Sequence, residues 1–217
     1  KMDIGLAFDG DADRCLAVDN DGNMVDGDQL IAIAALDMKE RGLLKKDTAV
    51  VTVMSNMGLC RSFDKLGIDY AETDVGDRFV YDYMVKNGCQ LGGEQSGHII
   101  FSKYATTGDG ILTAIMLTEE IKDRKSSISK LCAAVSLYPQ ITKNYKVTDK
   151  SAVTNDQELI NLVNEINERL SGNGRVILRA SGTENLIRVM AESATEEDCN
   201  SLINEIENKM KERDYLL

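Results

Sequence analysis

Thr48-Ala-Val-Val-Thr-Val-Met54 is an almost unbroken run of β-branched and apolar residues, and Met57–Leu66 and Ile68–Glu72 follow it. Such a run is typical of a strand buried on both faces of a sheet. Met57–Leu66 has the length of a short helix and stops at Gly67, after which Ile68–Glu72 reads as a second strand. Strand, helix and strand in this order predict a βαβ unit, from which α/β domains are built.

The same alternation extends in both directions from this unit. A helix is expected at Val75–Asn87, with Val75, Phe79 and Tyr83 on one face. The remaining predicted elements are strands at Cys15–Asp19, Asn23–Val25 and on both sides of a glycine-bearing loop between Leu91 and Phe101, and helices at Asp28–Gly42, Asp109–Asp123 and Ser127–Val135. We therefore expect an α/β domain with a mixed sheet.

The pattern changes at Pro139, the only proline. From there the expected order is strand, helix, strand, strand, helix, which suggests antiparallel strands with helices on one face. The ranges are Gln140–Val147, Asp156–Leu170, Val176–Ala180, Leu186–Glu192 and Glu196–Lys211. We place a domain boundary near Pro139 and predict a small α+β domain after it.

The composition bounds the functions that the chain can have. Of its 217 residues, 43% are hydrophobic and 28% are charged, as in a globular protein. The formal net charge of -11 argues against nucleic acid and anionic membrane surfaces as partners, because both attract basic faces. No apolar run reaches the roughly 18 residues of a membrane span. The five cysteines lie far apart, as reduced core thiols do, so we expect a cytoplasmic protein without disulfides or zinc.

An acidic loop, Asp9-Gly-Asp-Ala-Asp13-Arg14, spaces three carboxylates two residues apart. In an extended loop, Asp9, Asp11 and Asp13 can converge on a hard cation. A calcium EF-hand does not fit, because Arg14 stands where that loop needs glycine. An acidic surface turn is the other interpretation. Arg14 would hold a phosphate next to the metal, or form a plain surface ion pair.

A second loop, Gly92-Gly-Glu-Gln-Ser-Gly-His98, lies between two apolar strands and suits a polyhydroxylated ligand, since its glycines let the backbone approach closely. Glu94 and Ser96 are two residues apart, so in an extended segment they could form hydrogen bonds to adjacent hydroxyls, or to a hydroxyl and an ammonium group. A solvated loop is the alternative. His98, the only histidine, is either structural or a residue that transfers a proton or contacts phosphate. Thr106-Thr-Gly-Asp-Gly110 reads as a helix cap.

A third loop, Arg179-Ala-Ser-Gly-Thr-Glu184, connects two alternating strands. It offers a guanidinium group, two hydroxyls and a glycine turn whose amides can bind an anion, and Arg188 adds charge from the next strand. A hairpin turn alone would not need two flanking arginines. Phosphate binding is therefore the favoured interpretation.

Together the three loops, in this order and at this spacing, resemble the α-D-phosphohexomutase superfamily, and the similarity covers the whole chain. The acidic loop is similar to its magnesium loop, Gly93–His98 to its sugar loop and Arg179–Thr183 to its phosphate loop. Four features look like the phosphoglucosamine mutase branch rather than phosphomannomutase or phosphoglucomutase: Val53-Met-Ser-Asn-Met-Gly58, Val75-Gly-Asp-Arg78, Gln95 and Thr106-Thr-Gly-Asp-Gly110.

The resemblance implies a four-domain enzyme. Residues 1–14 would end domain 2 and carry the metal loop, residues 15–137 would form domain 3, and residues 138–217 would form the TATA-box-binding-protein-like domain 4. A Ser-His-Asn-Pro-type motif, which bears the phosphoserine of the family in domain 1, does not occur in this sequence. These 217 residues alone are therefore expected to be inactive.

The resemblance also implies a reaction. Mg²⁺ on Asp9, Asp11 and Asp13 would lie beside the phosphoserine, and glucosamine 6-phosphate would become glucosamine 1-phosphate through a 1,6-bisphosphate, for UDP-N-acetylglucosamine and cell-wall synthesis. Arg14 and His98 are the candidate catalytic residues. Expected contacts to the sugar phosphate substrate come from Glu94, Gln95, Ser96, Arg179, Ser181, Gly182, Thr183 and Arg188. The resemblance allows a homodimer of the full-length enzyme.

Three positions depart from the family pattern. Ala180 and Asn185 stand where proline is usual, which implies a less rigid phosphate loop, and Ala12, often glycine, should be tolerated. Two alternatives remain open: a phosphomannomutase or phosphoglucomutase, and a non-catalytic sugar-phosphate-binding module.

Overall fold

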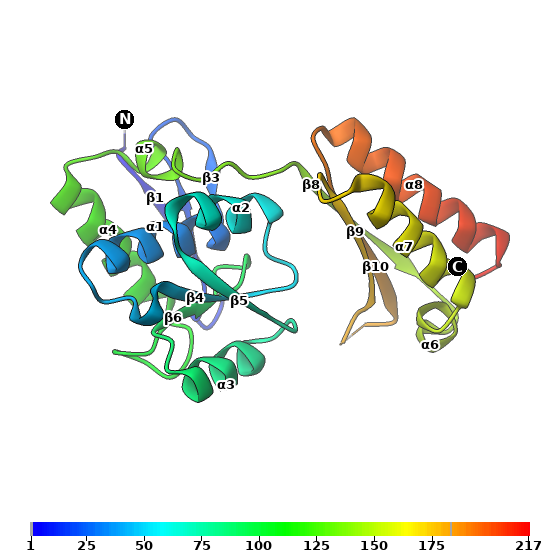
Figure 1. The fold of residues 1–217 in the computed structure, drawn as a ribbon, viewed down its shortest axis with the longest axis horizontal. Helices are drawn as coiled ribbons and strands as arrows, with labels where there is room; N and C mark the ends of the chain where they lie inside the picture. The colour runs from blue at the N-terminus through cyan, green and yellow to red at the C-terminus, as the bar shows by residue number, and fades with distance from the viewer. Residues whose placement is uncertain (1, 183) are drawn as a thin grey trace. The chain divides into compact units, whose positions relative to one another are not determined.

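The computed structural model describes residues 2–182 and 184–217, and it divides into two compact units, one ending at Leu137 and one beginning at Tyr138 (Figure 1). Each unit has its own hydrophobic core. Among the described residues, no helix is long and apolar enough to cross a bilayer. The assignment of residues 1–14 to a preceding domain stays a prediction.

The first unit is built on a four-stranded mixed sheet of order β5-β4-β6-β7. Strand β4 (Thr48–Thr52) pairs in parallel with β5 (Asp69–Thr73) and β6 (Leu91–Gly93), and β7 (Ile99–Phe101) runs antiparallel to β6. Side chains of β4 alternate between two cores, with Ala49 and Val51 on one face and Val50 on the other. The predicted βαβ unit and the mixed sheet are confirmed.

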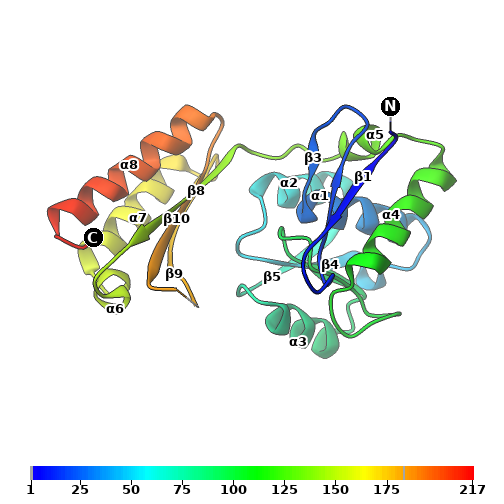
Figure 2. The same ribbon diagram turned by 180° about the vertical axis from the view of Figure 1, so that it is seen from behind.

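Helices cover both faces of this sheet (Figures 1 and 2). Helix α3 (Asp77–Asn87) packs Val80 and Met84 against Val50 on one face. On the other face lies α1 (Gly27–Glu40), which is buried on most of its circumference, as expected of a helix inside a core. The other helices of this unit are η1 (Lys45–Asp47), α2 (Met57–Leu66), α4 (Gly110–Arg124) and α5 (Ile128–Cys132).

A second, three-stranded antiparallel sheet of order β1-β2-β3 joins this unit. It contains β1 (Gly5–Phe8), β2 (Cys15–Val18) and β3 (Met24–Val25). The turn after β2 is closed by Asp19, whose Oδ1 accepts hydrogen bonds from the backbone N–H groups of Asp21 and Asn23, each at 2.8 Å. This sheet places the acidic loop, which connects β1 to β2, next to the start of α4.

The second unit is an antiparallel sheet of order β8-β10-β9 with helices on one face, as predicted (Figure 2). Its elements are β8 (Gln140–Lys146), α6 (Lys150–Thr154), α7 (Gln157–Leu170), β9 (Arg175–Ala180), β10 (Leu186–Glu192) and α8 (Glu196–Glu212). Ile187, Val189 and Ala191 of β10 point into the core. Residues 188, 190 and 192 therefore belong to the opposite face.

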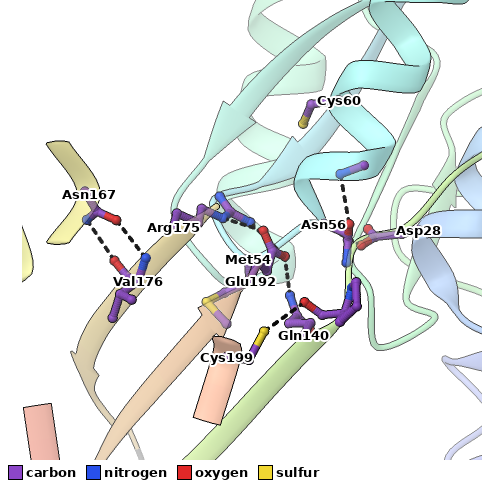
Figure 3. A network of polar contacts seen from close by, with 12 residues as sticks. Asp28, Met54, Asn56, Cys60, Gln140, Asn167, Arg175, Val176, Glu192 and Cys199 are labelled. Carbon is purple, nitrogen blue, oxygen red and sulfur yellow. Dashed lines mark hydrogen bonds and ion pairs between the residues drawn. The ribbon is translucent and has the colours of Figure 1, made fainter. Parts of the chain in front are cut away.

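A buried ion pair fixes one end of this opposite face (Figure 3). Glu192 is fully buried and accepts hydrogen bonds from Arg175 Nε at 2.7 Å and from Gln140 Nε2 at 2.6 Å. The three residues sit in one cross-strand row, since Glu192 is the register partner of both others. Their network holds β8, β9 and β10 together at the end of the sheet remote from the Arg179–Glu184 loop.

Candidate functional site

The acidic loop gathers its three carboxylates as predicted. One oxygen each from Asp9, Asp11 and Asp13 lies within 4.8 Å of the others. The loop turns sharply because the Ala12 N–H donates to the Asp9 carbonyl at 3.2 Å and Ala12 adopts a left-handed conformation with φ 58°. Glycine takes this conformation more easily than alanine does.

The donor set fits a hard divalent cation. Carboxylate oxygens are the ligands that Mg²⁺ prefers, and their mutual repulsion favours a bound cation. The Oδ1 atom of Asp13 is buried and has no hydrogen-bond partner among the described residues. Arg14 supplies partial neutralisation, because its Nε lies 3.6 Å from Asp9 Oδ2 and 3.8 Å from this same Asp13 Oδ1. A carboxylate oxygen that accepts no hydrogen bond and faces one guanidinium group is suited to a bound cation.

Two other loops brace the acidic loop through close glycine contacts. The Cys15 N–H donates to the Gly97 carbonyl at 3.1 Å, and Gly97 has φ 91°. The Gly110 N–H donates to the Ala12 carbonyl at 2.9 Å. A Cβ at Gly97 would overlap the Cys15 carbonyl, and one at Gly110 would overlap the Arg14 carbonyl. Both positions therefore require glycine.

His98 links the acidic loop to the loop at 106–110. Its side chain is 4% exposed, and its Nδ1 lies 3.0 Å from Asp13 Oδ2. Its Nε2 accepts a hydrogen bond from the Gly108 N–H at 3.0 Å. As predicted, the 106–110 segment also caps a helix, because Asp109 accepts from the Leu112 N–H at the start of α4.

The residues of the Gly92–His98 loop differ in their surroundings. Glu94 accepts a hydrogen bond from the Gly76 N–H at 2.9 Å, and Ser96 is exposed. The Gln95 amide Nε2 donates to Asp26 Oδ2 at 3.3 Å, and burial raises the pKa of the Asp26 carboxyl above its usual value. Gln95 thus supports the residue that caps α1.

Gly76 and Asp26 are site neighbours that sequence reasoning missed. Gly76 has φ 134°, which only glycine adopts readily, and it precedes the first residue of α3. Its place in the Val75-Gly-Asp-Arg78 motif was the one available signal. Asp26 forms a capping box with Gln29, a pattern that the sequence shows but that does not reveal the contact to Gln95.

The second unit holds the candidate phosphate site. Arg179 and Arg188 are register partners on β9 and β10, on the face opposite the helices. The Arg188 Nε is buried and has no hydrogen-bond partner among the described residues. Ser181 is buried, Gly182 is exposed, and the predicted contact Thr183 lies outside the described residues.

Lys150 and Asn185 restrain the Arg179–Glu184 loop through side-chain hydrogen bonds. The Lys150 Nζ donates to the carbonyls of Ser181 and Glu184, both at 2.8 Å. Asn185 Nδ2 donates to the Val147 carbonyl at 2.8 Å. The Ser181 Oγ accepts from the Glu184 N–H at 3.3 Å, which closes the turn. Side-chain hydrogen bonds therefore restrain a loop that lacks proline.

Two family models match the chain. "Phosphoglucomutase/phosphomannomutase, alpha/beta/alpha domain III" matches residues 26–138, and "Phosphoglucomutase/phosphomannomutase, C-terminal domain" matches residues 143–209. Among similar curated proteins, the phosphoglucosamine mutase of Halalkalibacterium halodurans is 50% identical over 211 residues, 97% of this chain and 47% of that protein. The phosphoglucosamine mutase of Bacillus subtilis is 48% identical over 206 residues, 95% of this chain and 46% of that protein.

The chain therefore spans about half the length of the curated relatives that it matches. Among solved structures, Aspergillus fumigatus N-acetylphosphoglucosamine mutase aligns with a TM-score of 0.81 at 22% identity, over 96% of this chain and 48% of that one. A second structure of the same fungal enzyme, in complex with GlcNAc-6P and magnesium, aligns with a TM-score of 0.76. These likenesses show the fold.

Proposed function

Because the chain belongs to the phosphoglucomutase/phosphomannomutase family, we propose that it forms the metal-, sugar- and phosphate-binding part of a phosphoglucosamine mutase, which interconverts glucosamine 6-phosphate and glucosamine 1-phosphate. The observation that carries the proposal is the contact between loops: Asp13 of the carboxylate cluster is hydrogen-bonded to His98 of the sugar loop. The relatives named phosphoglucosamine mutase support the choice of sugar.

Asp9, Asp11 and Asp13 would hold Mg²⁺. Bound there, the ion would neutralise charge on the oxygens of the phosphoryl group in transfer. Arg14 adds a guanidinium group to the same loop and would contact the same phosphoryl oxygens. The chain itself thus provides charge stabilisation rather than a nucleophile.

Each unit carries its own candidate contacts to a sugar phosphate. In the first, Glu94 and Ser96 would bind sugar hydroxyls, and the Glu94 carboxylate would pair with the ammonium group of glucosamine. In the second, Arg179, Arg188, Ser181 and Gly182 would hold the phosphate that does not react, since paired guanidinium groups and turn amides are strong phosphate donors. The nucleophilic phosphoserine would come from a motif of the type absent from this sequence, so these 217 residues would bind substrate without turning it over.

Calorimetry on the 217-residue chain in the presence of Mg²⁺ tests this division of labour. Glucosamine 6-phosphate should bind more tightly than glucose 6-phosphate or mannose 6-phosphate, and Glu94→Gln should remove the difference. Equal binding of the three sugar phosphates would refute the assigned sugar. Conversion of glucosamine 6-phosphate by the chain alone, followed by phosphorus NMR, would refute the assignment of the nucleophile to another segment.

A further inference from the structure

The first unit contains a pocket of about 490 Å³, and among the described residues that line it none belongs to the acidic, sugar or phosphate loop. It lies at the ends of β6 and β7 that are remote from the sugar loop, since that loop joins the end of β6 to the start of β7. Residues 88–90, just before β6, and residues 101–104, where β7 ends, line the pocket. We propose that it is a second ligand site, which binds a small molecule with a flat apolar body and one anionic group. The inference does not rest on the proposed function.

The interior of the pocket suits an apolar body. Four of its lining side chains are buried: Met38, Met84, Cys89 and Phe101. Met116 lines it as well, and methionine adapts to ligands of different shape because its side chain is flexible and polarisable. Leu43, Val85 and Tyr104 extend the apolar and aromatic surface outward, since they are 46%, 63% and 56% exposed. A pocket of this volume, mainly apolar with a few polar groups, is typical of small-molecule sites.

The charges that line the pocket are positive. Lys45 and Lys103 belong to it, and the lining residues that the structure describes include no aspartate or glutamate, although the whole chain has 36 acidic and 25 basic residues. The Lys103 Nζ lies 4.9 Å from the centre of the Tyr104 ring, which keeps this charge next to the aromatic surface. The Lys45 backbone N–H donates to Gln90 Oε1 at 2.7 Å, which fixes the main chain at the other lysine. An anionic group bound here would therefore meet two ammonium groups.

Two backbone acceptors beside the lysines are already satisfied. The Ser102 Oγ donates to the Cys89 carbonyl at 3.2 Å, and the Lys46 Nζ donates to the Asn87 carbonyl at 3.3 Å. The second bond also offsets the partial negative charge at the C-terminal end of α3. Gln90 uses its Oε1 to accept a backbone N–H, which leaves its Nε2 as a donor for a ligand. Donors therefore remain where acceptors are occupied, and this favours an anionic ligand.

Anilinonaphthalene sulfonate, a flat aromatic anion, serves as the probe. Its titration into the 217-residue chain, followed by calorimetry and fluorescence, should show one saturable site. Phenylnaphthylamine, which has the same ring system without the sulfonate group, should bind about tenfold more weakly, because charge-assisted hydrogen bonds are lost. Equal affinity for the two probes, or no saturable binding of the sulfonate, would overturn the proposal.

A pair of variants at Val85 changes the charge of the rim at nearly constant shape. Val85 is exposed on α3, so the fold should tolerate both glutamate and glutamine there. Val85→Glu should weaken binding of the sulfonate about tenfold relative to Val85→Gln, because the added carboxylate repels the anion. Lys45→Met and Lys103→Met, combined, should weaken it by a similar factor and leave binding of the neutral probe unchanged. Equal affinities for the sulfonate in Val85→Glu and Val85→Gln would contradict an anion site.

Nuclear magnetic resonance locates the bound probe. Backbone amide shifts at residues 88–90 and 101–104 should change as the sulfonate is added, and those of the second unit should not. Shift changes confined to other parts of the chain would place the probe elsewhere and overturn the assignment.

A protein segment is the other possible occupant, because this chain matches 46% of the length of the Bacillus subtilis relative. Titration of a chimera that joins these residues to the remaining part of that relative distinguishes the two occupants. An affinity for the sulfonate equal to that of the chain alone would support a ligand site. Loss of the site in the folded chimera would show that another segment covers the pocket, and would overturn the proposal.

Discussion

Arg179 and Arg188 lie directly opposite each other on neighbouring antiparallel strands, on the face of the second sheet that no helix of that unit covers. Like charges at such a pair of positions destabilise a sheet. The Arg188 Nε is, moreover, buried without a hydrogen-bond partner among the described residues. The Arg188 Nη2 lies 3.8 Å from Glu184 Oε2, so part of this charge is compensated within the chain. An anion bound beside the two arginines would add a further counter-charge, and this favours a phosphate site over a structural turn.

Arg188→Met should therefore separate stability from binding. Removing one of two facing charges relieves repulsion but also removes the ion pair with Glu184, so the free energy of unfolding should change by less than about 1 kcal/mol, while the affinity for sugar phosphate falls at least tenfold. Urea unfolding and calorimetry measure the two effects. A variant that loses stability in proportion to binding would show that Arg188 is a structural residue.

Arg175→Met is the matched control on the same sheet. Arg175 forms an ion pair with the fully buried Glu192, so its removal leaves an uncompensated buried charge. Breaking such a pair costs about 3–5 kcal/mol. A loss of stability for Arg175→Met that is several-fold larger than any change for Arg188→Met is the expected result.

Lys150→Met should loosen the phosphate loop. Two hydrogen bonds from one ammonium group to the carbonyls of Ser181 and Glu184 are lost, which should cost about 1–3 kcal/mol of stability and weaken sugar phosphate binding several-fold. Faster hydrogen exchange at residues 181–186 would locate the effect. Lys143→Met is the control, because the hydrogen bond that the structure describes for Lys143 goes to Asn204 Oδ1, at 3.4 Å, and not to this loop. This variant should leave sugar phosphate binding unchanged.

Ala12→Gly should stabilise the first unit. Ala12 has φ 58°, and a left-handed conformation costs a residue with a Cβ about 1–2 kcal/mol. Part of this gain is offset by the greater flexibility of glycine in the unfolded chain, so an increase of about 0.5–1 kcal/mol is expected in urea unfolding. Ala34→Gly, inside helix α1, should instead lower stability, and parallel losses in both variants would contradict the strain at Ala12.

Stability should fall in alkaline solution through two buried thiols. Burial raises the pKa of Cys15 and of Cys132 from 9.0 to about 11. The folded chain therefore keeps these protons where the unfolded chain has lost them, so the free energy of unfolding decreases as pH rises from about 9 to about 11. The Cys15→Ala, Cys132→Ala double variant should show a shallower decrease in urea unfolding across this range, and an unchanged slope would count against the assignment.

Much of the fold follows from local pattern. The β-branched run at 48–54 correctly predicts the strand β4, and the alternation of strands and helices around it correctly predicts the α/β class. Helix α6 was not predicted, because five residues capped by Asp149 carry no amphipathic period. The sequence predicts Val75, Phe79 and Tyr83 on one face of a helix at 75–87. The helix begins at Asp77, these three residues are 36%, 50% and 36% exposed, and the buried side chains are Val80 and Met84. The helix carries two apolar stripes, and spacing alone does not reveal which one the sheet covers.

The candidate site was predicted as separate loops and not as a network. The spacing of carboxylates in the acidic loop is enough to predict that Asp9, Asp11 and Asp13 lie close together. The bond between Asp13 and His98 spans 85 positions, and no local rule relates them. Likewise, Gly97 and Gly110 read as turn residues, although in the structure each is required by the carbonyl packed against it. Contacts between residues so far apart in the sequence are recognised only in the three-dimensional structure.

The most direct test of the proposed activity uses a chimera in which these residues replace the matched part of the Bacillus subtilis relative, to which they are 48% identical. Its kcat/KM would be measured with glucosamine, glucose and mannose phosphates in one coupled assay. We predict turnover that depends on Mg²⁺, is abolished by Asp11→Asn and is highest with glucosamine phosphate. A folded chimera that prefers glucose or mannose phosphate, or that keeps its rate after Asp11→Asn, would contradict the account.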